Sequence, residues 1–197
     1  MRVLVLDNGD PFPDNLLAPL RELGAECDVR SSAALGIEEV RDLEPRRILL
    51  TPGPGRPEGT GACLAVVEHL AGLVPILGIG LGLQAIAHVA QARLVPPGDR
   101  RKNAMGDLTT IRHDGKNLFA GLPSPFNALR DPNPSLIVDP RKPGSQLEAS
   151  AWDERGRVVG CRAWALAMEG VQVDTRWFST QLGNDMLFNF LYQSQVW

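Results

Sequence analysis

The sequence predicts an α/β fold built on an open, mostly parallel sheet with helices on both faces. In the first half, short aliphatic runs alternate with segments whose apolar residues recur at helical spacing, as is typical of strand–helix–strand units. In the second half, short extended runs are separated by Pro, Gly and Asp turns, which indicates additional antiparallel strands. With 197 residues and 44% hydrophobic composition, the chain is expected to form a single domain, residues 1–197.

In the first half, residues 2–6 (RVLVL) read as a strand. Residues 16–23 carry leucines at helical spacing, although Pro19 interrupts that helix because proline removes a backbone hydrogen bond. The further elements expected in this half are strands at 26–30, 47–51 and 74–79, and helices at 60–73 and 83–90.

The second half reads as a series of short strands closed by a helix. The extended runs are residues 107–113, 134–139, 146–152, 157–164 and 166–173. Residues 184–194 then place Met186, Leu187, Phe190 and Leu191 on one face, which predicts a terminal helix that packs against the core.

Composition disfavours several classes of function. A net charge of −3 gives no general attraction to nucleic acid or to anionic membranes, and no apolar run is long enough for a membrane span. Cys27, Cys63 and Cys161 cannot all pair as disulfides, and their wide spacing matches no zinc motif. We therefore expect a cytoplasmic protein without a metal ion or other cofactor.

The stretch VPILGIGLGLQAIAHVA (74–90) predicts a strand that turns sharply on glycines into a helix. Gly78, Gly80 and Gly82 are out of register for the dinucleotide-binding motif GxGxxG, and no Lys-Ser/Thr pair follows as in a phosphate-binding loop. The remaining device with this architecture is a nucleophile elbow, whose small flanking residues allow a tight turn. At its apex stands Gly80, which has no side chain.

Ordered motifs along the chain resemble those of the class I glutamine amidotransferases. The motifs are LDNGDPF, LTPGPGRPEGTG, PILGIGLGLQAIA, DGKNLFAGLPSPF, PSLIVDP and MEGVQV. They are most similar to the small subunits of anthranilate synthase and aminodeoxychorismate synthase. The resemblance implies a flavodoxin-like fold and a hetero-oligomer with a chorismate-utilising synthase, to which such subunits pass ammonia from glutamine.

The same resemblance implies that the catalytic positions are altered. The family elbow GxCxGHQ reads GIGLGLQ here, so Gly80 takes the cysteine position and Leu83 the adjacent histidine position. The late family motif QFHPES reads QVDTRW, which puts Asp174 at the base, Thr175 at the proline and Arg176 at the orienting glutamate.

Other positions keep residues of the family type. The resemblance assigns these pocket and oxyanion-type positions to Gly53, Gly55, Leu81, Gln84, Ser135 and Leu136. The remaining cysteines and the scattered His69, His88 and His113 are not placed to replace the altered residues. Glutaminase activity is therefore expected to be negligible.

Asp174 and Arg176 leave two interpretations open. On an extended segment their side chains point to one face, where they form either a space-filling ion pair, with Asp131 as a candidate third member, or a new polar ligand site. Correspondingly, the chain is expected to be a catalytically inactive, glutaminase-like subunit that acts as a structural or regulatory partner of a synthase. The alternative is a repurposed enzyme or small-molecule binder that uses the old pocket.

Overall fold

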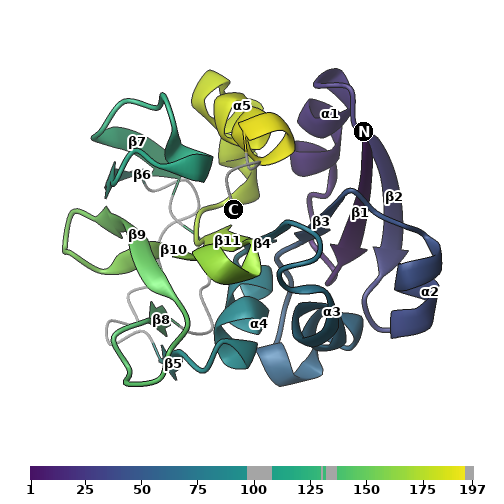
Figure 1. The fold of residues 1–197 in the computed structure, drawn as a ribbon. Helices are drawn as coiled ribbons and strands as arrows, with labels where there is room; N and C mark the ends of the chain where they lie inside the picture. Colours follow the sequence, from purple (N-terminus) through teal and green to yellow (C-terminus); the bar gives the residue numbers. More distant parts are fainter. Residues whose placement is uncertain (97–107, 130, 132–136, 194–197) are drawn as a thin grey trace.

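The structure is a computed structural model that describes residues 1–96, 108–129, 131 and 137–193. Within these residues the chain forms one nine-stranded sheet and one small two-stranded sheet (Figure 1). In spatial order the large sheet contains β2 (Glu26–Ser31), β1 (Arg2–Asp7), β3 (Arg47–Leu50), β4 (Ile76–Ile79), β11 (Met168–Val171), β10 (Val158–Ala163), β9 (Glu148–Asp153), β6 (Leu108–His113) and β7 (Phe126–Leu129). The small sheet pairs β5 (Arg93–Val95) with β8 (Ile137–Asp139).

The large sheet changes character at β11. The strands from β2 to β11 are parallel, whereas those from β11 to β7 are antiparallel. Strand β11 was expected to be antiparallel only, and this is wrong on one side: it pairs in parallel with β4 and antiparallel with β10. The predicted α/β class, with extra antiparallel strands in the second half, is confirmed.

Helices cover both faces of the parallel part (Figure 1). The α-helices are α1 (Asp14–Glu22), α2 (Ile37–Asp42), α3 (Ala62–Leu70), α4 (Leu81–Val89) and α5 (Gln181–Phe188), which continues as a π-helical segment, η5 (Asn189–Gln193). The short 3₁₀-helices are η1 (Pro57–Gly59), η2 (Asn117–Phe119), η3 (Trp164–Leu166) and η4 (Thr175–Ser179). Helix α1 continues through the buried Pro19.

Alternation along the strands divides the core into two layers. Val3 and Val5 of β1 face a cluster with α1 and α5, whereas Leu4 and Leu6 face a second cluster with α2, α3 and α4. Side chains of a strand alternate between the two faces of the sheet. Because this strand is aliphatic throughout, both of its faces are buried, and helices are needed on each side of the sheet. The terminal helix packs as expected, with its four predicted apolar residues buried.

Among the α-helices and strands, three escaped the sequence patterns, namely α2, β5 and β7, and the short 3₁₀-helices were not predicted either. Helix α2 has six residues, of which only Val40 is buried, and β5 and β7 have three and four residues. None of these segments is long enough to show a period. In the part of the chain that the structure describes, no helix is both long and apolar enough to cross a membrane.

Candidate functional site

The predicted elbow is present between β4 and α4. Gly80 has φ +57° and ψ −112°, a backbone conformation that side chains of L-residues rarely adopt. Its N–H donates to the Val171 carbonyl at 3.0 Å, and its own carbonyl accepts from the Gln84 N–H at 3.1 Å. A Cβ at this position would lie 3.2 Å from Cβ of Pro52. The turn therefore has the shape of an elbow, and its apex is a glycine, which adopts this conformation without the strain that a side chain would bring.

The glycines that flank the apex are required by close backbone contacts. A Cβ at Gly78 would lie 2.6 Å from the Gly82 carbonyl oxygen, and one at Gly82 would lie 2.2 Å from the Leu50 carbonyl oxygen. Such distances are well below any van der Waals contact. These two glycines thus let β3, β4 and α4 approach one another, as an elbow needs.

The glycine loop after β3 is bound to the end of β1. A Cβ at Gly53 would lie 2.1 Å from the Asn8 carbonyl oxygen. The Asn8 N–H donates to the Thr51 hydroxyl oxygen at 2.9 Å, and Nδ2 of Asn8 donates to the Thr51 carbonyl at 2.7 Å. Gly55, with φ +98°, lies beyond in open space. The loop is held at the carboxyl ends of the parallel strands, where ligands of such sheets bind.

Asp174 and Arg176 form the expected ion pair, but the backbone between them has a different conformation from the one expected. Asp174 caps the 3₁₀-helix η4 rather than lying with Arg176 on one extended segment, so that part of the prediction is wrong. Its Oδ1 accepts from the backbone N–H and from Nε of Arg176, both at 2.9 Å, and its Oδ2 accepts from Nη2 at 2.6 Å. The helical turn brings the arginine back over the carboxylate, which raises the pKa of Arg176.

The segment that carries this pair crosses from β11 to the far edge of the sheet. The Asp174 N–H donates to the Leu129 carbonyl of β7 at 3.1 Å, and the Trp177 indole N–H donates to the Asn127 carbonyl of the same strand at 3.1 Å. Asp131 accepts from Gln172 Nε2 at 3.5 Å. Its participation in the Asp174–Arg176 pair stays a prediction.

The register places these features at one edge. Strand β4 ends at Ile79 and strand β11 ends at Val171, and these two residues lie opposite each other in the sheet. Gly80 follows β4 directly and Asp174 follows β11 by three residues. Both residues therefore lie at the carboxyl ends of neighbouring strands. Leu81 and Gln84 are buried at the start of α4, at 4% and 2% exposure. Ser135 and Leu136 lie outside the described residues.

A buried acid that the sequence patterns did not single out also lies here. Asp10 follows β1 and is 8% exposed. Its Oδ1 accepts from the Phe12 N–H at 2.9 Å, whereas its buried Oδ2 has no hydrogen-bond partner among the described residues. Burial raises the pKa of Asp10, and the negative charges of Asp7 and Asp174 raise it further. The sequence signal that could have identified this acid is the presence of a second aspartate, Asp10, shortly after Asp7 at the end of the first strand.

The three thiols lie elsewhere and are not activated. Burial raises the pKa of Cys63 and of Cys161 to about 12, and it also raises the pKa of Cys27. Cys27 is on β2, Cys63 on α3 and Cys161 on β10. A thiol with a raised pKa is protonated at neutral pH and is a poor nucleophile. Among the described residues, no group of three or more His, Cys, Asp or Glu could hold a metal ion.

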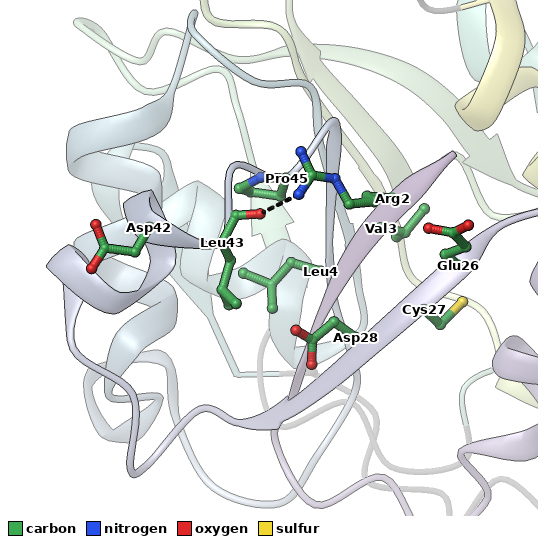
Figure 2. A pocket seen from close by; sticks show the side chains of 9 residues that line it. All are labelled: Arg2, Val3, Leu4, Glu26, Cys27, Asp28, Asp42, Leu43 and Pro45. Carbon is green, nitrogen blue, oxygen red and sulfur yellow. Dashed lines mark hydrogen bonds between the residues drawn. The ribbon is translucent and has the colours of Figure 1, made fainter.

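A separate groove of about 480 Å³ lies at the opposite, amino-terminal edge of the sheet. It is lined by the first residues of β1 and β2 and by the loop that follows α2. Figure 2 shows Arg2 reaching the Leu43 carbonyl across this groove, at 3.4 Å. Because this groove lies away from Gly80, it does not belong to the elbow site.

The family model described as "Glutamine amidotransferase class-I" matches residues 4–194. Aminodeoxychorismate synthase component 2 of Klebsiella aerogenes is 36% identical over 189 residues, which cover 96% of this chain and 98% of the relative. Anthranilate synthase component 2 of Thermus thermophilus is 39% identical over 194 residues, which cover 97% of this chain and 92% of the relative.

Solved structures share the fold. A crystal structure from Thermoplasma acidophilum, described as one component of a GMP synthase, has a TM-score of 0.79 at 22% identity, with 97% of this chain and 92% of that chain covered. A glutamine amidotransferase from Thermotoga maritima has a TM-score of 0.72 at 15% identity, with 98% and 97% covered. The family model and the relatives at 36% and 39% identity show that the chain belongs to the class I glutamine amidotransferases.

Proposed function

We propose that this chain is a glutaminase-type subunit without glutaminase activity, which serves as a structural or regulatory partner of a chorismate-utilising synthase. Relatives at 36–39% identity over nearly the whole chain are named component 2 of aminodeoxychorismate synthase and of anthranilate synthase. The observation that carries the proposal is Gly80, which keeps the backbone conformation of an elbow and has no side chain that can attack an amide.

Among the described residues, the three thiols and Asp174 are not set up to act as a substitute nucleophile or base at Gly80. The three thiols have raised pKa values and lie on other elements. Both carboxylate oxygens of Asp174 accept hydrogen bonds from Arg176, so the carboxylate is held as an ion-pair partner rather than presented as a general base. Because nucleophile and base act as a unit in acyl transfer, the loss of both leaves little activity.

The test is glutamine hydrolysis by the purified full-length chain, measured as glutamate released with and without the synthase component of the same organism. The Klebsiella aerogenes relative, assayed in parallel, serves as the positive control. We expect no release above the protein-free background in either condition. Release that depends on the protein and survives further purification would contradict the proposal.

The partner is tested separately by co-purification with that synthase component and by measuring its turnover with ammonium as the nitrogen source. A stable hetero-oligomer, or a changed turnover in the presence of the chain, is expected. A chain that neither binds the synthase component nor alters its turnover would argue against the partner role.

A second candidate function is a small-molecule site in the old pocket. It is favoured by Arg176, whose guanidinium is fixed on Asp174 through Nε and Nη2 and whose side chain is 30% exposed. A guanidinium held in this way is suited to bind a carboxylate through its remaining donors. Asp174→Ala and Arg176→Ala should abolish such an activity, whereas a partner role should survive both if docking is intact.

A further inference from the structure

Another groove, of about 350 Å³, lies between the small sheet and the hairpin that β9 and β10 form. Figure 1 shows β8 beside these two strands. The walls come from two separately paired units, because Val95 and Asp139 belong to the small sheet, and Trp152 and Arg157 to the hairpin. The residues around Gly80 do not line it. This hairpin groove is therefore separate from the elbow site.

Apolar side chains supply much of the surface of the hairpin groove. Val95, Trp152 and Val158 line it, and each of them is half-buried. Trp152 and Val158 lie opposite each other in the register of β9 and β10, so paired backbone holds both of them in place. An indole ring on such a support offers an apolar face against which a second ring can pack.

Arg157 adds a guanidinium whose position is already fixed. Its Nε donates to Oδ2 of Asp153 at 2.7 Å, and its Nη2 lies 2.7 Å from the same oxygen. The Asp153 side chain is 1% exposed, and its Oδ1 accepts the backbone N–H groups of Arg155 and Arg157. These contacts use Nε and Nη2, whereas a guanidinium has five N–H donors. An anion in the groove can therefore bind Arg157 without first having to order it.

A second guanidinium lies at the rim of the groove. Arg141 lines it and donates to Asp139 through Nε at 2.8 Å and through Nη2 at 3.2 Å. Arg93 lies opposite Asp139 in the small sheet, and the two arginines lower the pKa of Asp139, Arg141 more strongly. Three cations, with Arg157, thus face two carboxylates, Asp139 and Asp153, and the excess favours an anion. Because the Arg141 side chain is 84% exposed, solvent screens its charge more than that of Arg157.

We propose that the hairpin groove binds a small aromatic carboxylate, with its ring against Trp152 and its carboxylate on the remaining donors of Arg157. The volume of about 350 Å³ is near the lower limit of small-molecule sites, which suits a ligand of one or two rings. The apolar walls favour a ligand with a hydrocarbon body over a bare inorganic anion. Arg141 adds a weaker contact at the rim. This site needs neither glutamine chemistry nor a partner subunit.

The experiment titrates the full-length chain with cinnamate and follows the backbone amide signals by NMR. Cinnamamide, which has nearly the same shape and no charge, is titrated in parallel. We expect cinnamate to bind with a Kd of about 1 mM or tighter, as a ligand of this size allows, and cinnamamide to bind at least about tenfold more weakly because it cannot pair with the guanidinium. The largest shifts should fall at residues 152–158, where the amide of Gly156 lies beside the groove.

Two variants test the two halves of the site. Arg157→Lys keeps the positive charge beside the buried Asp153 but removes the planar fork, and should weaken cinnamate binding about fivefold or more. Trp152→Leu keeps an apolar side chain but removes the ring, and should have an effect of similar size. Arg30→Gln is the matched control, because Arg30 binds Asp28 through the same Nε and Nη2 atoms on β2, and should stay within about twofold of wild type.

Binding that is saturable, prefers cinnamate and weakens in both groove variants would support the inference. The absence of saturable shifts up to about 10 mM cinnamate, or equal affinity for cinnamamide, would overturn it. Shifts that gather around Gly80 and disappear in Arg176→Ala would assign the carboxylate to the old pocket instead and would also overturn it. Circular dichroism shows whether each variant is folded, and if one is not, the other variant and the amide comparison decide. The synthase takes no part in these titrations, so their result leaves the proposed partner role unchanged.

Discussion

The carboxylate of Asp174 lies 2.6 Å from Nη2 of Arg176, two residues along the chain, on the turn that follows β11. The Asp174 side chain is 6% exposed and the Arg176 side chain 30% exposed, so the aspartate is buried and the arginine is partly exposed. Asp174 also receives the backbone N–H of Arg176. The two residues thus bind each other within one short turn, at the positions where the family resemblance expects a histidine and a glutamate.

Arg176→Gln is expected to destabilise the chain by about 1 kcal/mol, because the buried carboxylate loses two charge-assisted bonds. The measurement is the midpoint of urea unfolding at pH 7. Arg141→Gln is the control: Arg141 makes the same three contacts to Asp139 at an exposed site, where solvent screens the pair. Equal losses of stability in the two variants would show that burial of Asp174 does not strengthen its ion pair with Arg176.

Gly80→Ala is expected to cost about 1–2 kcal/mol, since a side chain at φ +57° is strained and its Cβ would meet Pro52. Gly59→Ala is the matched control, with no atom within 4 Å of the added Cβ and no positive φ, and should change stability by no more than about 0.5 kcal/mol. Both are measured by chemical denaturation. A Gly80→Ala variant as stable as wild type would mean that the elbow backbone relaxes.

A buried ion network joins the two halves of the sheet and should make stability depend on pH. Arg162 is fully buried and binds Asp114 at 2.7 Å and its cross-strand partner Glu169 at 2.9 Å. Glu169 also accepts the Leu118 N–H at 3.2 Å. Burial is the main cause that raises the pKa of Glu169, from 4.5 to about 7, while Arg162 opposes the shift.

Because the folded chain holds this proton more tightly than the unfolded chain, the stability that Glu169 contributes is present below pH 4.5 and falls as pH rises to about 7. Glu169→Gln should remove this pH dependence of the free energy of unfolding. Between about pH 5 and pH 8, wild type should therefore lose on the order of 2 kcal/mol of stability relative to the variant. Urea unfolding at both pH values measures it. Glu38→Gln, at an exposed side chain, should leave the slope unchanged, and an unchanged slope in Glu169→Gln would contradict the assignment.

The native thiols are expected to react slowly with iodoacetamide at about pH 8. Cys63 and Cys161 have pKa values of about 12 and are buried, whereas Cys27 is partly exposed and should be labelled first. In urea all three should react quickly. Mass spectrometry after timed quenching gives the order, and fast labelling of Cys63 or Cys161 in the folded chain would contradict their burial.

The sequence was sufficient to predict the parallel core because its strands are aliphatic on both faces, as in Val3 to Leu6, and because the apolar residues of its helices recur at regular spacing. It was insufficient for α2 and β7, because α2 buries Val40 alone and the four residues of β7 are too few to show a period. The same limit applies to the site. Gly80 is visible from spacing, and the Asp174–Arg176 pair was anticipated although its helical turn was not. Asp10 escaped because its burial depends on segments far along the chain.

The turn that carries Asp174 and Arg176 has a second consequence. Strand β7 ends the sheet among the described strands, and an open strand edge is a template on which other chains can pair and aggregate. Here the Asp174 N–H and the Trp177 indole occupy carbonyls of that edge. The turn therefore blocks part of this edge from pairing with another chain, through contacts that the side chains of the Asp174–Arg176 ion pair do not make.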